Sequence, residues 1–421
     1  MLTVDSFQKS LRELTQSKTF CVAFSGGLDS SVLLDLLSQL SVIETGISIR
    51  AIHIHHGLSA NADRWADLCT TYCARYHIPL VIKHINIKRD NESVEEQARN
   101  LRYNVFKELL SEKEVLVTGH HRNDQAETLL LQLFRGAGPK GLASMPAATR
   151  FGKGLLARPL LGFDKESLKQ YAEIQTLNWV EDESNRNLLF DRNYLRNSLL
   201  PLIQSRWPAV IENLSRAATH CANANHFIET QIADVFVEAF DPEQLTLSIP
   251  AVLKHALPVQ NHIIRYWLQQ LNLSLPSTQK LALLLKEIMN ARPDAVPLLR
   301  WKNVEVRRYG DHLYAMRPLL KHSPNLVIDW DLQQDLPLPG DLGVIRLQEV
   351  EQLGLKLHEL QEVSIRFRQG GEKCLLKNRQ NRHCLKKLFQ AWRIPPWRRD
   401  RIPLLYAQNR LKAIIGFVTC E

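Results

Sequence analysis

The chain has 421 residues, too many for one ordinary hydrophobic core, so two or three domains are expected. Its composition, 45% hydrophobic and 23% charged, is typical of a soluble globular protein. No run of about 18 apolar residues is present, so no membrane span is expected. The first 20 residues are polar and lack an apolar signal core, which argues against secretion.

The net charge of +9 is concentrated at one end of the chain. Residues 361–421 hold 14 lysines and arginines against 4 acidic residues, a net charge of +10, and the remaining residues have a net charge of −1. A basic block of this kind is typical of a domain that binds a polyanion, above all a nucleic acid. The alternative is a solvated basic face that serves only solubility.

Seven cysteines are scattered along the chain, at positions 21, 69, 73, 221, 374, 384 and 420. Their low and odd number favours a reducing compartment, so we expect a cytoplasmic protein rather than a disulfide framework. Cys69 and Cys73 lie within an apolar helical stripe, which indicates structural burial rather than metal binding.

Strands and helices alternate over the first half of the chain. Apolar runs predict strands at 19–24, 47–56, 80–87 and 115–121. Apolar residues at helical spacing predict helices at 31–40, 61–77, 94–110 and 124–134. This alternation, with right-handed crossovers, predicts a doubly wound α/β domain with a Rossmann-like parallel sheet.

The pattern changes near residue 201, and the segments up to about residue 300 are predicted to be mostly helical. The Pro/Gly-rich stretch 335–343 is predicted to be a linker. We therefore expect a catalytic domain over 1–215, a mainly helical middle domain over 216–335 and a small basic α+β domain over 345–421.

The segment SGGLDS, residues 25–30, joins the first predicted strand to the first predicted helix. Gly26 and Gly27 remove side chains from the turn, so backbone N–H groups and the helix N-terminus can bind a phosphate. Ser25 and Ser30 add hydroxyl donors. Asp29 would repel a phosphate on its own, which indicates that it holds a Mg²⁺ ion bridging to the phosphates. The alternative is a capped glycine turn without a ligand.

The loop is not a Walker A motif, because it lacks the required lysine. A second glycine motif, GAGPKG at 136–141, follows a predicted helix rather than a strand, so we reject a dinucleotide site there. SGGLDS instead resembles the PP-loop motif of the ATP pyrophosphatase superfamily. That resemblance implies a loop that grips pyrophosphate while ATP is split between its α and β phosphates.

Further motifs resemble, in this order, the catalytic domain of the tRNA(Ile)-lysidine synthase family. They are HIHHGLSANAD (53–63), GHHRNDQAET (119–128), RGAGPKGLASM (135–145), RPLL (158–161), EDESN (181–185) and DRNYLRNSLLP (191–201). The segments IRFRQGGEKC and LKKLFQAWRIPPWRRDRIPLLY resemble the tRNA-binding C-terminal domain of the same family.

The resemblance implies a carbon–nitrogen ligase that joins L-lysine to C2 of cytidine 34 in the CAU anticodon of tRNA(Ile). ATP would adenylate the cytidine with release of pyrophosphate, and the lysine amine would then displace AMP to give lysidine. Two alternatives stay open: a PP-loop tRNA thiolase or amide-forming ATP pyrophosphatase, and a tRNA-binding protein without catalysis. The oligomeric state is also open, a homodimer included.

Asp124 and Glu127 lie three residues apart, on one face of the helix that follows the fourth predicted strand. We expect this pair to bind a metal or to hold and deprotonate the lysine ammonium; a solvated acidic face is the alternative. Many family members carry two adjacent aspartates where this chain has Asn123-Asp124, so the expected role falls on Asp124. Arg196 is expected to face the ATP phosphates or the cytidine.

The predicted site residues form three groups. The catalytic group is Asp29, Asp124, Glu127 and Arg196, with Asp29 also the metal ligand. The ATP-binding group is Ser25, Gly26, Gly27, Leu28, Asp29, Ser30 and His55. The tRNA-binding group is Arg192, Arg366, Arg368, Lys386, Lys387, Arg398 and Arg399. Trp392 and Trp397 lie among the basic residues, and we expect core packing rather than base stacking from them.

Overall fold

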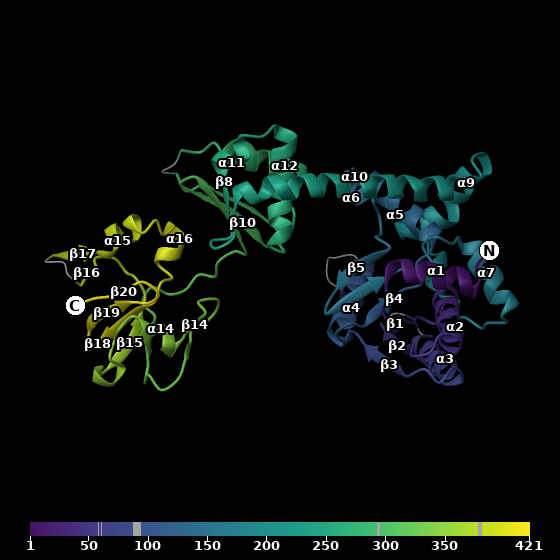
Figure 1. Ribbon diagram of the computed structural model, residues 1–421, viewed down its shortest axis with the longest axis horizontal. Coiled ribbons are helices and arrows are strands. Elements are labelled where there is room, and N and C mark those ends of the chain that lie inside the picture. Colours follow the sequence, from purple (N-terminus) through teal and green to yellow (C-terminus); the bar gives the residue numbers. More distant parts are fainter. Residues whose placement is uncertain (58, 60, 87–93, 293–294, 378–380) are drawn as a thin grey trace. The chain divides into compact units, whose positions relative to one another are not determined.

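The computed structural model describes residues 1–57, 59, 61–86, 94–292, 295–377 and 381–421. The chain divides into two compact units, Met1–Ile228 and Glu229–Glu421 (Figure 1). Within these described ranges, no helix has both the length and the apolar character needed to cross a bilayer. Residue 87, the predicted end of the third strand, lies outside the described residues.

The described part of the first unit contains a six-stranded sheet in the order β3-β2-β1-β4-β6-β5. Its strands are β1 Thr19–Ala23, β2 Ser48–His55, β3 Leu80–His84, β4 Val115–Val117, β5 Ala148–Phe151 and β6 Gly154–Ala157. Every pairing among β3, β2, β1, β4 and β6 is parallel, whereas β5 is antiparallel to β6. The predicted parallel sheet is confirmed, and the structure adds an antiparallel hairpin at one edge.

Helices alternate with these strands, as predicted. They are α1 Val4–Leu14, α2 Leu28–Ile43, α3 Ala62–Arg75, α4 Val94–Leu109, α5 Arg122–Phe134, α6 Pro139–Leu142 and α7 Lys165–Ile174. A 3₁₀ turn, Glu183–Arg186, precedes a helical segment made of α8 Asp191–Tyr194, a π-helical turn Leu195–Leu199 and α9 Leu200–Arg206. Helix α10, Val210–Ala239, follows.

Buried apolar clusters lie on both faces of the sheet. Phe20 and Val22 of β1 pack in a cluster with side chains of α1, α2 and α7, whereas Cys21 packs in a second cluster with Phe106 of α4. This division follows from the strand geometry, because successive side chains point to opposite faces. Since both faces are covered by helices, the carboxyl edge of the sheet is the place where a ligand can bind.

Among its described residues, the second unit contains helices and a five-stranded antiparallel sheet in the order β7-β8-β11-β10-β9. The helices, which confirm the predicted helical character, are α11 Ile249–Leu253, α12 Leu257–Gln270, α13 Thr278–Leu283 and a π-helical turn Leu284–Ile288. The strands are β7 Phe240–Asp241, β8 Thr246–Ser248, β9 Leu298–Trp301, β10 Val304–Tyr309 and β11 His312–Met316. The sequence did not predict this sheet, because strands as short as β7 and β8 show no periodicity.

A small α+β domain completes the second unit, with a sheet in the order β12-β15-β18-β19-β20 and two separate hairpins, β13-β14 and β16-β17. Its strands are β12 Val327–Asp329, β13 Leu336–Pro337, β14 Val344–Ile345, β15 Val363–Arg366, β16 Lys373–Leu375, β17 Arg382–Cys384, β18 Leu404–Ala407, β19 Arg410–Ile414 and β20 Val418–Thr419. Its helices are α14 Leu347–Gln352, α15 Leu385–Ala391 and α16 Pro396–Arg399, with a 3₁₀ turn at Leu357–Glu359.

The Pro/Gly-rich stretch 335–343 is not the linker that the sequence predicted. It contributes β13 and the turn of the β13-β14 hairpin, and Leu338 packs in the core of the small domain. Strand β12, which precedes this stretch, pairs with β15. Proline and glycine therefore shape a tight turn here rather than a flexible connection.

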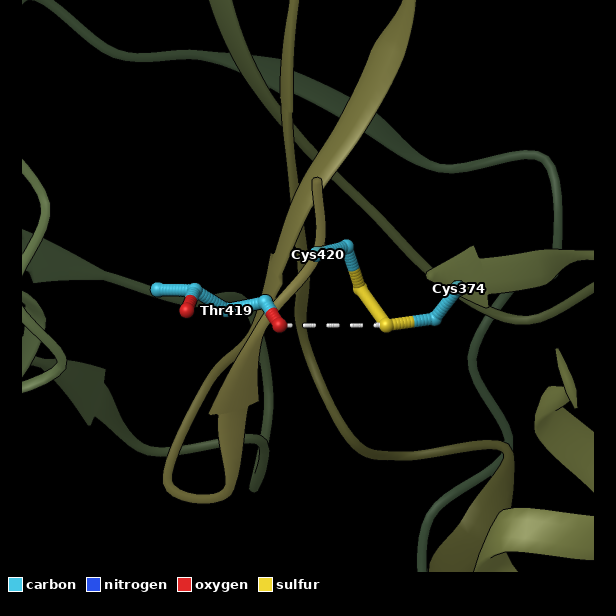
Figure 2. The surroundings of a disulfide bond; sticks show 3 residues. All are labelled: Cys374, Thr419 and Cys420. Atoms are coloured by element: carbon cyan, nitrogen blue, oxygen red, sulfur yellow. Dashed lines mark hydrogen bonds between the residues drawn. A yellow bond between two sulfur atoms is a disulfide. The ribbon is translucent and has the colours of Figure 1, made fainter. Parts of the chain in front are cut away.

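A disulfide in the small domain joins Cys374 of β16 to Cys420 (Figure 2). The two Cα atoms are 5.1 Å apart, and both side chains are buried. The expectation of a protein without a disulfide framework needs a correction at this pair. This pair could not be predicted from the sequence, because the pairing depends on a β-bridge between Leu376 and Cys420 that closes a long loop.

Reduction of this disulfide is expected to lower the free energy of unfolding of the second unit. The crosslink spans 46 residues, so its loss restores about 4 kcal/mol of loop entropy to the unfolded chain. The measurement is urea unfolding of the oxidised and the reduced protein. The variant Cys420→Ser should behave like the reduced protein with or without reductant, and identical midpoints for all samples would contradict the prediction.

Candidate active site

The turn between β1 and α2 requires its two glycines. Gly26 has a φ of +80°, and a Cβ at this position would lie 2.9 Å from Cys69 Sγ, so both conformation and space exclude a side chain. Gly27 is the N-cap of α2 and places no side chain over the first N–H groups of the helix. The turn therefore offers backbone donors and a helix N-terminus to an anion.

The two serines of the loop stabilise it through hydrogen bonds within the loop. Their hydroxyl oxygens lie 3.0 Å apart, and Ser30 Oγ donates to the carbonyl oxygen of Gly27 at 3.0 Å. Ser30 is buried, whereas Ser25 is exposed. Phosphate binding by these hydroxyls stays a prediction, with Ser25 the better placed of the two.

Asp29 lies in the first turn of α2, with 39% of its side chain exposed. Its Oδ2 lies 3.7 Å from His121 Nε2, whereas its Oδ1 is buried without a hydrogen-bond partner. Removal from water raises the pKa of Asp29, and the neighbouring His121 opposes this shift. A buried carboxylate oxygen without a partner suits a cation, so the residues present fit a Mg²⁺ ion here.

The protein supplies few ligands for such an ion. In the part of the chain that the structure describes, no group of three or more His, Cys, Asp or Glu side chains could hold a metal ion. Phosphate oxygens and water would therefore have to complete the coordination shell around Asp29, as is usual for Mg²⁺.

Two buried carboxylates and two half-buried guanidinium groups form a cluster beside this loop, which we call the acid–arginine cluster (Asp124, Glu127, Arg192 and Arg196). Arg192 lies 3.2 Å from Asp124 Oδ1 and 2.7 Å from Glu127 Oε2. Arg196 lies 3.0 Å from Asp124 Oδ1 and 2.7 Å from Glu127 Oε1. Glu127 is 1% exposed, so it depends on both arginines for charge compensation.

The charges in the cluster stabilise one another. Burial alone would raise the pKa of Asp124, but the positive charges of His121 and Arg192 outweigh burial and hold this pKa at about 2. Burial likewise opposes the charged form of Arg196, yet its bonds to Glu127 raise its pKa. Asp124 is therefore a permanent anion at neutral pH and a poor general base.

His121 connects the loop to the cluster. Its Nε2 lies 3.7 Å from Asp29 Oδ2 and 3.5 Å from Asp124 Oδ2, and its backbone N–H donates to Asp124 Oδ2 at 3.0 Å. The ring is 1% exposed, and its Nδ1 has no hydrogen-bond partner. His121 belongs to the motif GHHRNDQAET, but the sequence did not predict that it bridges two of the predicted catalytic carboxylates.

Gly119 is a site residue that the sequence analysis missed. A Cβ at this position would lie 2.7 Å from the backbone oxygen of Asp29, so the end of β4 packs directly on the first turn of α2. The signal was present in GHHRNDQAET, where a glycine follows a strand, a place typical of close backbone approach.

The burial of His120 predicts that the free energy of unfolding depends on pH. Burial lowers the pKa of His120 to about 3, while an unfolded histidine titrates at about 6.5. Below pH 6.5 the unfolded chain therefore takes up a proton that the folded chain refuses, so the free energy of unfolding falls as the pH falls toward 3. We expect His120→Gln to flatten this slope in urea unfolding between pH 7 and 4. The exposed His220 on α10 is the control, and an equal change in His220→Gln would contradict the prediction.

The histidines at the end of β2 already have partners. His55 Nε2, predicted to bind ATP, lies 2.9 Å from Asp63 Oδ1, so ATP contact there stays a prediction. His53, which the sequence analysis passed over, is buried, with Nδ1 3.0 Å from the Phe24 carbonyl oxygen and 3.4 Å from Cys69 Sγ. His53 thus supports the strand end from which the loop departs.

The predicted tRNA-binding residues of the small domain differ in exposure. Lys386 and Lys387 are exposed on α15, where a phosphate can reach them. Arg366 and Arg368 are half-buried, and Arg368 lies 2.8 Å from the Asp400 carboxylate. Surface pairs of this kind are weak and can exchange for a phosphate.

The structure gives Arg399 a different role from the predicted tRNA contact. Arg399 is 8% exposed, and it donates to the Ile394 carbonyl oxygen at 2.8 Å and to the Tyr309 hydroxyl at 3.2 Å. Its guanidinium therefore ties α16 to β10 inside the second unit. Arg398 is exposed, and the half-buried Trp397 packs edge-on against Tyr309, in line with the expected core role.

The loop and the parallel sheet define a class: the family model of the PP-loop domain matches residues 3–203. The TilS substrate binding domain matches residues 247–314, and the TilS substrate C-terminal domain matches residues 363–421. A protein of Coxiella burnetii named tRNA(Ile)-lysidine synthase is 40% identical, over 100% of this chain and 94% of that protein. Proteins of the same name from Legionella pneumophila and Shigella flexneri are 39% identical, over 97% of this chain and 93% and 94% of theirs. The chain belongs to the tRNA(Ile)-lysidine synthase family.

Proposed function

We propose that the chain is an ATP-dependent ligase that joins L-lysine to C2 of cytidine 34 in the CAU anticodon of tRNA(Ile), releasing AMP and pyrophosphate. The observation that carries this proposal is the link from the SGGLDS loop through His121 to the acid–arginine cluster. It stands in a chain whose relatives over the full length are named for this reaction.

The loop acts in the adenylation step. Its N–H groups and the N-terminus of α2 bind the pyrophosphate end of ATP, as backbone donors do at an anion site. Asp29 would hold Mg²⁺, and the bound ion would supply Lewis-acid neutralisation of the phosphate charge. Cytidine O2 attacks the α-phosphorus, and the bond from that phosphorus to the bridging oxygen breaks. Because the nucleophile is a neutral carbonyl oxygen, charge neutralisation matters more here than a strong base.

The acid–arginine cluster acts in the ligation step. With a pKa of about 2, Asp124 stays ionised and is suited to hold the lysine ammonium in place rather than to deprotonate it. The ammonium passes its proton to solvent water, and the free amine then forms the bond to C2 as the bond from C2 to the AMP oxygen breaks. Glu127 lies on the same face of α5 and shares both arginines. Arg192 and Arg196 would turn from the carboxylates toward phosphate or the cytidine once an ammonium replaces them as the positive partner.

Cys69 and Cys73 do not support the thiolase alternative. Cys69 and Cys73 are buried, and burial raises the pKa of each thiol to about 12. A thiol with such a pKa carries almost no thiolate at neutral pH, so neither is a sulfur nucleophile.

We also propose a cytoplasmic location, where ATP, lysine and tRNA are present together. A homodimer stays an untested expectation.

The function is tested by incubating the protein with ATP, labelled lysine and tRNA transcripts that carry a CAU or a GAU anticodon. We expect label in the CAU transcript alone, with one pyrophosphate released for each lysine incorporated. Incorporation that requires sulfide would support a thiolase, and tRNA binding without incorporation would indicate a protein without catalysis. Either result would overturn the proposal.

The basic residues of the small domain are expected to contact the tRNA backbone. The double variant Lys386→Ala/Lys387→Ala should raise the Kd for tRNA about 10-fold at low salt. It should also reduce the slope of log affinity against log salt concentration by about 2, since each lysine releases counterions from a phosphate. The measurement is filter binding over a range of salt concentrations, with a GAU transcript in parallel. Both transcripts should lose the same affinity, and a loss confined to the CAU transcript would contradict a backbone role.

A further inference from the structure

An apolar groove on the first unit has no part in the mechanism above. We call it the α5–α8 groove, and its volume is about 380 Å³. It is lined by Leu131, Phe134, Arg135, Asp191, Tyr194, Leu195 and Leu199. Phe134 is 64% exposed and Tyr194 is 52% exposed. Two aromatic rings left in water beside a cavity are costly and indicate a binding surface.

The groove continues the acid–arginine cluster along the same two elements. On α5, Glu127, Leu131 and Phe134 are four and three residues apart, so they lie on one face of the helix. Leu195 and Leu199 follow Arg192 and Arg196 at three-residue intervals on the partner segment. Seven residues of helix separate Glu127 from Phe134, about 10 Å along the axis. The acid–arginine cluster and the α5–α8 groove therefore lie along one interface between α5 and the segment that begins with α8.

We infer that the α5–α8 groove binds the anticodon-loop nucleotides next to the target cytidine, with their bases on Phe134 and Tyr194. The inference rests on the proposed function. To reach ATP, the cytidine must leave the base stack, and its covalent neighbours then lose a stacking partner. Aromatic side chains replace that partner for any base, and Arg135 at the rim suits the connecting phosphate.

The dimensions and chemistry of the groove favour this occupant over others. A second copy of the chain would need about 800 Å² of contact surface on each partner, whereas only seven residues line this half-open groove. The small substrates have other places, because phosphates and ammonium groups need the charged loop and cluster. The aromatic and aliphatic lining matches the faces of nucleobases. Its two charged residues, Arg135 and Asp191, give the groove no net charge, so the contact to a backbone phosphate falls to Arg135 alone.

The test measures binding of a CAU anticodon stem-loop, with 2-aminopurine in place of the adenine at position 35, to Phe134→Ala and Tyr194→Ala. Each variant should raise the Kd about 10-fold, since one base–aromatic contact accounts for such an effect. The variant that lacks the ring stacked on position 35 should also lose the fluorescence quenching that wild-type protein imposes. Leu133→Ala is the matched control, because Leu133 is exposed on α5 next to Phe134 but does not line the groove. Phe134→Trp should retain both affinity and quenching.

Several results would overturn the inference. Unchanged stem-loop affinity with a raised KM for lysine or ATP would assign the groove to a small substrate. Unchanged affinity with an altered sedimentation coefficient would assign it to a second copy of the chain. The lysine-incorporation assay on wild-type protein keeps the two proposals separate. If wild-type protein incorporates lysine and both groove variants bind the stem-loop as wild type does, only the groove proposal is wrong. If wild-type protein does not incorporate lysine, the proposed function is wrong.

Discussion

Replacing Asp29 by alanine is expected to slow ATP-dependent pyrophosphate release about 10³-fold while leaving the Kd for tRNA within about 2-fold of wild type. The expected loss is large because Asp29 Oδ1 is a buried carboxylate oxygen without a protein partner, placed in the first turn of α2. A cation bound there would neutralise phosphate charge that no other side chain of the loop can neutralise. The measurement is single-turnover pyrophosphate release at saturating tRNA.

Asp67→Ala is the matched control for this variant. Asp67 is an exposed aspartate on α3 of the same unit, and its removal should leave both rate and affinity unchanged. Asp29→Asn keeps the shape of the side chain but removes its charge, so it should be nearly as slow as Asp29→Ala. If either Asp29 variant lost tRNA binding instead of pyrophosphate release, the metal role would be wrong and Asp29 would be structural.

Replacing Glu127 by alanine is expected to destabilise the first unit by about 3–5 kcal/mol, a large part of the stability of an ordinary domain. Glu127 is 1% exposed and lies 2.7 Å from both Arg192 and Arg196. Without it, two guanidinium groups would face each other around Asp124 alone. Lysine incorporation should fall as well, because the arginines would then hold Asp124 more tightly.

The second unit offers a matched comparison. Glu305 is fully buried between Arg300 and Arg307, each at 2.9 Å. Glu305→Ala should therefore destabilise its unit in urea unfolding as Glu127→Ala does in the first, yet leave single-turnover lysine transfer at low temperature unchanged. Equal effects of the two variants on transfer would mean that Glu127 acts through stability alone. A Glu127→Ala protein as stable as wild type would contradict the role of its charge.

Much of the catalytic fold could be predicted because its signals are local. Buried parallel strands such as β1 are continuous apolar runs, and helices such as α2 show their own spacing, so the doubly wound sheet followed directly. The antiparallel sheet from β7 to β11 was missed because its shortest strands carry no period. The segment 335–343 was misassigned, since proline and glycine mark a tight hairpin and a linker alike.

The candidate site shows the same division between local and long-range information. Asp124 and Glu127 were predicted from their spacing on one helix. The roles of Arg192 and His121 were not, because each depends on elements distant in sequence that meet only in the fold. Arg399 was grouped with the basic surface because its charge is visible in the sequence, whereas its burial against Tyr309 is not.

The close contact at Gly119 has a consequence for how the site opens. There is no room for even a methyl group between residue 119 and the Asp29 backbone, so the segment that leads into α5 packs directly against the first turn of α2. We therefore expect the carboxylates on α5 to keep their place beside the loop when a substrate is admitted. The arginines are carried by a different segment, whose π-helical turn interrupts the regular helix beside Arg196. Admission of an ammonium group must then involve motion of the arginine side, so relaxation-dispersion signals should be found on residues 191–199 rather than on residues 119–127.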